Sequence, residues 1–198
     1  MENNNPDPRK YLEETPKLNT TVVRFSQLTS KAKEIMLPQL KEIFYQSSSK
    51  KTFKSTEERE EFFMKWCGDY LDYFPEFFYL MVDEASNLLC YLCICPDTAA
   101  NLARLKVKSL SIFSEQYAKY PAHLHMNTHE NYRGLGLGGM ILAAAETDLR
   151  IKKIKGLHLI TEESARNFEF YKRHGFQDIF IKEYLNTQLC LMGKDLNS

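Results

Sequence analysis

The sequence predicts a single α/β domain, and three observations lead to that prediction. The chain has 198 residues, which is enough for one substantial core and slightly short for two. Segments with strand-like alternation and segments with helical periodicity follow one another along the chain. No internal repeat interrupts this order. We therefore expect one central sheet flanked by helices.

The first residues differ in composition from the rest. They are polar and contain Pro6, Pro8 and Pro16. Such a segment cannot bury enough apolar surface to offset the entropy lost on ordering. We expect residues 1–19 to form a flexible tail and residues 20–198 to form the domain.

The chain then predicts a strand followed by a helix. Residues 20–27, TTVVRFSQ, predict the strand, and Thr29 or Ser30 can cap the helix that follows. Pro38 lies inside the helical pattern. Because proline lacks a backbone N–H and clashes with the preceding turn, we expect it to bend or divide this helix.

A capping box, Ser55-x-x-Glu58, predicts the start of another helix. Apolar residues fall on one broad face of it: Phe62, Phe63, Trp66, Cys67, Tyr70 and Leu71. Such a stripe could line a substrate cleft, but we favour packing in the core.

The remaining elements follow the same alternation. Residues 76–97 predict a β-hairpin with a polar turn at residues 84–87. Residues 97–120 are expected to be partly helical, and Pro121 ends that segment. The further elements are a strand at 122–129, a helix at 138–153, a strand at 156–163, a helix at 164–174 closed by Gly175, and strands at 176–184 and 187–194.

The charge balance and the absence of long apolar runs limit the expected partners. The chain has 26 basic and 26 acidic residues, which gives no electrostatic reason to expect nucleic acid or an anionic membrane. No apolar run approaches the roughly 20 residues of a membrane span, and the first residues, MENNNPDPRK, lack a signal-peptide pattern. We expect a cytoplasmic protein, monomeric or homodimeric, with no nucleic-acid or membrane partner.

The five cysteines raise the question of a metal site. Cys90 and Cys93 have CxxC spacing, but no second CxxC pair follows. In a strand, Cys93 and Cys95 would share one face while Cys90 faces the other. The odd number also argues against a disulfide framework. We expect buried thiols and no metal.

A glycine cluster is the main functional signal. Four of the eight glycines lie within six positions: Gly134, Gly136, Gly138 and Gly139. Such a density indicates that backbone must approach something closely. The spacing Gly134-x-Gly136-x-x-Gly139 satisfies the dinucleotide fingerprint, whereas Arg133-x-x-Gly136-x-Gly138 is a different phosphate loop.

The surroundings favour the second phosphate loop. Five polar residues, 129–133, separate the strand from the glycines, and that strand alternates polar and apolar residues, unlike a buried parallel strand. Only about 60 residues follow the loop, which is short for a dinucleotide-binding sheet. No Gly-Lys-Ser/Thr follows, which excludes the triphosphate loop. Successive backbone N–H groups at a helix N-terminus suit a pyrophosphate.

The segment NYRGLGLGGMIL resembles the acetyl-CoA pyrophosphate loop of the GNAT acetyltransferases, whose signature is Gln/Arg-x-x-Gly-x-Gly/Ala. Downstream, FEFYKRHGF resembles the FYxxxGF segment of that family. The close resemblance covers about residues 120–180. It implies a mixed, mostly antiparallel sheet in which the strand before the loop splays from its neighbour. It also implies acetyl-CoA as co-substrate, with an amine attacking the thioester directly.

The resemblance also implies roles for individual residues. The pyrophosphate would be held by Arg133, Gly134, Leu135, Gly136, Leu137, Gly138 and Gly139. The pantetheine arm and the thioester carbonyl would bind Met126, Asn127 and Thr128. Tyr171 matches the tyrosine that protonates the departing thiolate. Many relatives contact the cofactor arm through an asparagine at the position of Ser164, and Asn167 lies three residues further on.

Transfer to an amine also requires a group that keeps the nucleophile neutral. The candidates are His123, His125, His129, Glu130, Glu162 and Glu163. Strand alternation places His123 and His125 on one face with Asn127, and histidine is the best intrinsic base of the set. We name Tyr171, His125 and Glu130 as the catalytic candidates.

The stretch YPAHLHMNTHENYRGLGLG also resembles a GNAT subgroup that includes the acetyltransferase-like domain of O-GlcNAc hydrolases. Members often show HLHID before the loop, and Asn127 stands where that aspartate would be. An amide cannot act as a base, which keeps a second hypothesis open: a catalytically inactive binding or regulatory module. The acceptor stays open between a small amine, an amino sugar, a lysine and a protein N-terminus. We expect its recognition in residues 29–75 and 97–120.

Overall fold

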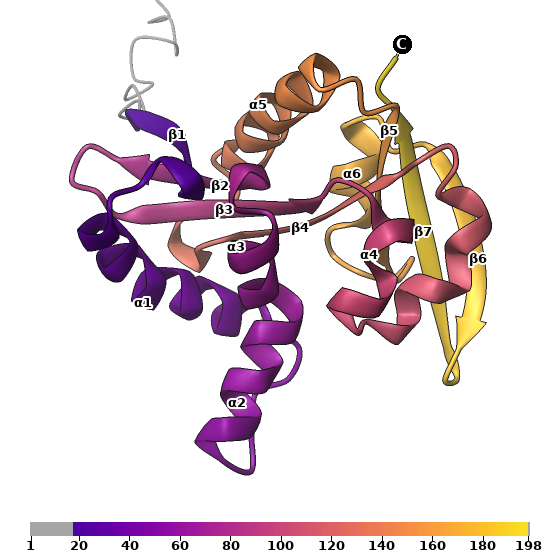
Figure 1. The fold of residues 1–198 in the computed structure, drawn as a ribbon, viewed down its shortest axis with the longest axis horizontal. Coiled ribbons are helices and arrows are strands. Elements are labelled where there is room, and N and C mark those ends of the chain that lie inside the picture. The colour runs from indigo at the N-terminus through magenta and orange to yellow at the C-terminus, as the bar shows by residue number, and fades with distance from the viewer. Residues whose placement is uncertain (1–17, 198) are drawn as a thin grey trace, which may run out of the picture.

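The computed structural model describes residues 18–197 (Figure 1), so the tail expected at residues 1–19 lies almost entirely outside the described residues. The strands are β1 (Thr20–Arg24), β2 (Phe78–Asp83), β3 (Leu88–Cys95), β4 (Ala122–Thr128), β5 (Gly156–Thr161), β6 (Asp178–Tyr184) and β7 (Thr187–Asp195). The α-helices are α1 (Ser30–Ser47), α2 (Thr56–Phe63), α3 (Asp69–Tyr73), α4 (Thr98–Leu105), α5 (Leu137–Ile151) and α6 (Phe168–Arg173). A π-helical turn, η3 (Met64–Gly68), joins α2 to α3, and 3-10 turns include η2 (Phe25–Gln27), η5 (Lys108–Gln116) and η6 (Glu130–Tyr132).

The strands form one open sheet in the order β1-β2-β3-β4-β5-β7-β6. All neighbouring pairs are antiparallel except β4 and β5, which are parallel. These two strands share only the pairs Ala122↔Leu157 and His123↔His158, so residues 124–128 of β4 have no partner on β5. The predicted mostly antiparallel sheet and its splayed strand are confirmed.

A hydrophobic core lies on each face of the sheet. On one face, α5 packs Ile141 and Leu142 against Leu92 and Leu124. On the other face, α1 and the α2–α3 segment pack residues such as Ile43 and Tyr70 against β2 and β3. Figure 1 shows α5 on one side of the sheet and α1 with α3 on the other.

The aromatic stripe predicted on the second helix belongs mainly to the core. Four of its members are buried: Phe63, Cys67, Tyr70 and Leu71. Trp66 is only partly buried and lines a cavity. Core packing therefore accounts for most of the stripe, and one aromatic side chain is left for a ligand.

The helix starts follow the predicted capping residues. Thr29 accepts a hydrogen bond from Ala32 N–H, and Ser55 accepts one from Glu58 N–H. The Glu58 carboxylate accepts from Lys54 N–H, one residue before the position that a capping box requires. Pro38 lies inside α1, which continues through it undivided.

Two predicted elements are shorter than expected. The first strand ends at Arg24, and η2 follows it. The helix expected from residue 164 begins only at Phe168, because Ala165 N–H bonds Glu162 O and Phe168 N–H bonds Ala165 O in tight turns. Short polar side chains such as Asn167, which accepts from Thr161 Oγ1, favour turns over helix. The predicted hairpin and the C-terminal strands are confirmed.

The five cysteines are buried free thiols, as the strand pattern predicts. Burial raises the pKa of Cys90 and of Cys95 to about 12, so both remain protonated thiols at neutral pH. Within residues 18–197, no group of three or more His, Cys, Asp or Glu side chains is arranged to hold a metal ion. No helix in that range is long and apolar enough to cross a membrane.

Candidate active site

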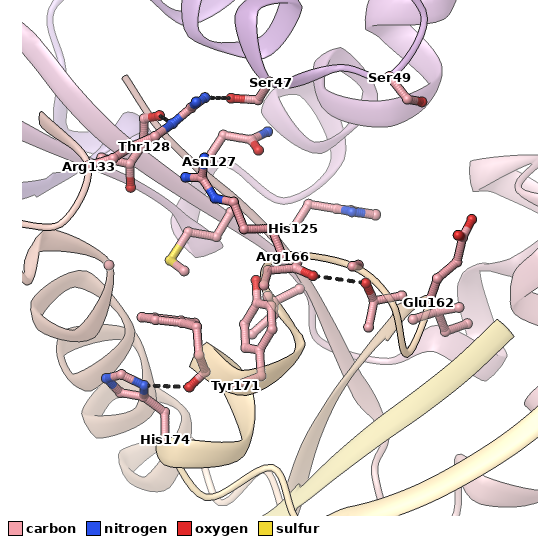
Figure 2. Close-up of a pocket in the computed structure, with 18 of the residues that line it drawn as sticks. Ser47, Ser49, His125, Asn127, Thr128, Arg133, Glu162, Arg166, Tyr171 and His174 are labelled. Carbon is pink, nitrogen blue, oxygen red and sulfur yellow. Dashed lines mark hydrogen bonds between the residues drawn. The ribbon is translucent and has the colours of Figure 1, made fainter. Parts of the chain in front are cut away.

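A cavity of about 1090 Å³ opens where β4 leaves β5. Its lining comes from both faces of the sheet (Figure 2). On the α5 face, the lining includes the glycine loop and α6. On the opposite face, it includes the end of α1, Trp66 and part of η5. We call these two parts the loop half and the α1 half of the cavity.

The backbone of β4 borders the gap between the two halves. His129 N–H donates to Leu89 O at 2.9 Å. This bond shows which N–H groups of β4 point toward β3 in the antiparallel pair. Donors alternate along such a strand, so His125 and Asn127 N–H point toward β3. The N–H groups of Met126 and Thr128 therefore point into the gap beside β5.

The glycine loop brings several unengaged backbone donors to the cavity. Gly134 and Gly136 have φ values of +83° and +80°, a left-handed conformation that glycine adopts without steric cost. Gly136 caps α5 and offers no side chain to its first turn. Within the described chain, the N–H groups of residues 134–138 have no hydrogen-bond acceptor. Such an array at a helix N-terminus is suited to an anion.

Two further glycines allow α5 to approach α6. A Cβ atom on Gly138 would lie 3.2 Å from the Phe170 ring, and one on Gly139 would lie 2.7 Å from His174 Nε2. The His174 ring cannot move freely, because its Nδ1–H donates to Phe170 O at 2.8 Å (Figure 2). The density of glycine in this loop thus reflects both left-handed backbone and close helix packing.

The structure separates the predicted loop residues into two groups. Gly134, Gly136, Leu137, Gly138 and Gly139 line the cavity, whereas the Leu135 side chain is 53% exposed and does not. Arg133 also lines the cavity, but its guanidinium group bonds to the protein.

The Arg133 side chain makes two hydrogen bonds. Its Nε–H donates to Thr128 O at 3.1 Å, and its NH2 group donates to Ser47 Oγ at 3.1 Å. Arg133 therefore ties the loop to β4 and α1.

Replacing Gly136 by alanine is expected to lower the free energy of unfolding by about 1–2 kcal/mol, the cost of left-handed backbone for a residue with a Cβ atom. No atom of the described residues lies within 4 Å of the added Cβ, so the cost comes from the backbone alone. Gly136→Asn is the matched control, because asparagine visits this region more readily. Urea unfolding should rank wild type above Asn above Ala; equal losses for Asn and Ala would contradict this origin.

Tyr171 lies on α6 at the meeting point of the two halves. It lines the cavity, its side chain is 3% exposed, and its ring packs against Phe170 and Phe176. Figure 2 shows the ring pointing from α6 into the cavity, toward β4. Burial raises the pKa of Tyr171 well above the ordinary value of 10, so the phenol stays protonated across the physiological range.

The histidines of β4 face the α1 half, as strand alternation predicts. His123 is buried in a defined network. Thr98 Oγ1–H donates to Pro121 O at 2.8 Å, so the contact between Thr98 Oγ1 and His123 Nδ1 at 2.7 Å requires Nδ1–H as the donor. Nε2 then accepts from Tyr70 O–H at 2.6 Å. This network fixes a neutral His123.

His125 lines the cavity beside His123. Its Nε2 is buried and has no hydrogen-bond partner among the described residues. Its ring lies edge-on to Trp66 and Tyr70, with centroids 5.9 and 5.5 Å away. Desolvation lowers the pKa of His125 to about 4, so the imidazole is neutral at pH 7.

The other predicted site residues are placed as follows. Asn127 lines the cavity, and its amide donates to Tyr91 O–H at 2.6 Å. Asn167 also lines the cavity. Ser164 does not, and lies with Glu162 and Glu163 at a smaller hollow of about 400 Å³. Glu130, the third catalytic candidate, lies exposed in η6 outside the lining.

Several lining residues carry no motif that sequence analysis could have found. They are Gln46, Ser47, Ser49, Ser109, Arg166 and His174. Gln46, Ser47, Ser49 and Ser109 come from the end of α1, the residues just after it, and η5, which lie within the segments where acceptor recognition was expected. Only their position in the folded chain identifies these residues as candidates. Polar residues at helix ends are common, so the sequence alone does not mark them.

The comparisons with known proteins agree with this geometry. Residues 101–178 match the family model described as an acetyltransferase (GNAT) domain. No curated protein is significantly similar to the chain in sequence.

Three solved structures illustrate the similarity of fold. SsHAT is 16% identical, with a TM-score of 0.64, over 90% of this chain and 98% of that chain. A Drosophila melanogaster polyamine N-acetyltransferase is 12% identical, with a TM-score of 0.63, over 89% of this chain and 100% of that chain. A GNAT-family acetyltransferase from Staphylococcus aureus is 13% identical, with a TM-score of 0.55, over 90% and 99%.

Proposed function

We propose that this chain acts as a GNAT acetyltransferase that transfers the acetyl group of acetyl-CoA to a primary amine, since residues 101–178 match the GNAT family model and the fold resembles that of a GNAT-family structure. The observation that carries the proposal is the cavity through the sheet. One half presents unengaged backbone donors for an anionic cofactor. The other half can admit an acceptor from the opposite face, so the two substrates meet beside Tyr171.

The loop half suits acetyl-CoA. The N–H groups of residues 134–138 would bind the pyrophosphate at the start of α5. Met126 and Thr128 N–H would bind the pantetheine arm and the thioester carbonyl in the gap beside β5. Fixed donors at that carbonyl would stabilise the negative charge that develops on its oxygen when the amine attacks.

Tyr171 and His125 would manage the protons. The amine nitrogen forms a bond to the acetyl carbon, the carbon–sulfur bond breaks, and Tyr171 O–H protonates the departing thiolate. His125 Nε2 is a neutral acceptor on β4 without a partner among the described residues. Because the pKa of His125 is about 4, its main role would be to orient a neutral amine rather than to deprotonate an ammonium ion.

A second candidate function is a module that binds acetyl-CoA without turnover. Two placements favour it: Ser164 lies outside the cavity, and the Asn127 amide is engaged with Tyr91. Neither residue then supplies the cofactor contact or the base that relatives use.

The test is calorimetry with acetyl-CoA, followed by CoA thiol release with a panel of amines. We expect binding and amine-dependent release. Absence of heat would contradict both functions, whereas binding without release on any amine would favour the module. The Gly136→Ala variant should bind acetyl-CoA more weakly, which links the heat to the glycine loop.

A further inference from the structure

The α1 half contains a buried oxygen that residues 18–197 leave unpaired. Gln46 lines the cavity, and its Nε2 donates to the Glu42 carboxylate at 3.2 Å. This bond fixes the orientation of the amide, because a carboxylate cannot accept from Oε1. Gln46 Oε1 is then buried with no partner among the described residues. An unpaired buried acceptor is costly, so it indicates a ligand with a donor.

His125 Nε2 is the second unpaired buried atom of the lining. It reaches the same half from β4, on the face that Gln46 approaches from α1. Both residues line the same cavity, so one ligand can pair with both atoms. A ligand that satisfies both must carry at least two polar hydrogens at different positions.

The other polar groups of this half are hydroxyls. Ser47, Ser49 and Ser109 line it. Ser47 Oγ already accepts from Arg133, so its O–H is left to donate. Trp66 adds a partly exposed aromatic ring, held edge-on to His125. Hydroxyls and an amide around one aromatic ring can bind hydroxyl groups and pack against the C–H surface of a sugar ring.

The charges of the lining argue against two other acceptor classes. A polyamine would need several carboxylates, and Glu162 is the one acid among the described lining residues. A lysine side chain would fill the half with methylene groups and offer hydrogen-bond donors at one position only. Arg166 also lines the cavity and has no ion pair within the described chain. Its charge suits a cofactor phosphate, and an acidic amine is included below as a competing class.

The low basicity of His125 also favours an acceptor amine that is less basic than lysine. His125 is a weak base, whereas a lysine ammonium has a pKa near 10.4. An amine with neighbouring electron-withdrawing oxygens is less basic than lysine. A larger fraction of it is neutral at pH 7, so it needs less help to become a nucleophile.

Building on the proposed function, we propose that the α1 half binds an amine whose ring carries several hydroxyl groups, the amino-sugar class. Gln46 Oε1 accepts a hydrogen bond from a ligand hydroxyl, His125 Nε2 accepts one from the amine, the serine hydroxyls complete the polar contacts, and Trp66 packs against the ring. Gln46 is the residue that determines specificity for hydroxyl groups.

The test measures binding separately from turnover. D-glucosamine and cyclohexylamine, a ring amine without hydroxyls, are titrated into the CoA-saturated protein by calorimetry. Putrescine, glutamate and a lysine peptide complete the panel. We expect glucosamine to bind at least tenfold more tightly than each of the others. A preference for any other amine would overturn the inference.

Gln46→Met keeps the size of the side chain and removes the orphan oxygen. It should weaken glucosamine binding about three- to tenfold, the usual net value of one hydrogen bond, and leave cyclohexylamine binding unchanged. Gln177→Met, at an exposed position outside the cavity lining, is the control and should change neither. Equal weakening of both ligands by Gln46→Met would overturn the assigned role, and thermal unfolding checks that the variant is folded.

The binding assay and the release assay can contradict the two proposals separately. Glucosamine binding that depends on Gln46, without N-acetylation, would keep this inference and contradict the proposed acetyl transfer. Acetylation of another amine, with no glucosamine binding, would contradict this inference and keep the transfer.

Discussion

The Tyr171→Phe variant is expected to lower kcat for acetyl transfer by about 100-fold or more, the usual contribution of a positioned general acid. The phenol is the proton donor that projects from α6 into the meeting point of the two cavity halves. Phenylalanine keeps the packing against Phe170 and Phe176 and removes only the hydroxyl. Acetyl-CoA affinity should therefore change little. Steady-state CoA release and calorimetry together measure both quantities.

The pH dependence provides a second check on Tyr171. Because burial raises the pKa of Tyr171 above 10, loss of the phenolic proton should not reduce kcat up to pH 9. Tyr73→Phe is the matched control, since Tyr73 is 43% exposed and lies outside the cavity lining. If Tyr171→Phe and Tyr73→Phe gave the same kcat as wild type, Tyr171 would not be the acid.

The second large expected effect is loss of stability in acid. His123 and His158 are buried and His125 is half-buried, and desolvation is the main cause that lowers the pKa of each below the ordinary 6.5, to about 4 for His125 and His158. Between those values the unfolded chain binds more protons than the folded chain. The free energy of unfolding therefore falls as pH falls below 6.5, and the histidine contribution is fully present above it.

The slope can be stated per histidine. Each contributes up to about 1.4 kcal/mol per pH unit between pH 6.5 and its folded pKa. Urea unfolding at a series of pH values measures the sum. His125→Phe removes an imidazole that makes no hydrogen bond with a described residue, so it should flatten the slope by one histidine without orphaning a partner. An unchanged slope would show that His125 binds its proton equally well in the folded and the unfolded chain.

The fold could be predicted well because local signals and global topology agree. Alternation and turn residues predicted the hairpin of β2 and β3, and the glycine-to-helix transition at α5 was visible directly. The start of α6 could not be found, because residues 164–167 contain no proline or glycine to mark a turn. The π-helical turn at Met64–Gly68 likewise leaves no trace in a helical pattern.

The loop half of the site was predictable, and the α1 half was not. Backbone donors in the loop depend on glycines, which are visible in any sequence. Gln46 and Ser47 become functional candidates only because α1 ends beside β4, and that placement depends on packing distant in sequence. The Arg133 side chain illustrates the limit. The motif identifies the residue, but only its contacts with Thr128 and Ser47 show that it ties the loop in place.

The gap between β4 and β5 also bears on how the domain holds together. Strands β1–β4 and strands β5–β7 are joined within the sheet by two residue pairs alone. A ligand lying in the gap with hydrogen bonds to β4 would take the place of the missing strand pairing. Such a ligand binds the folded chain and not the unfolded one, so its concentration contributes to folding stability. While it is bound, such a substrate would hold strands β1–β4 and β5–β7 together as an additional strand would.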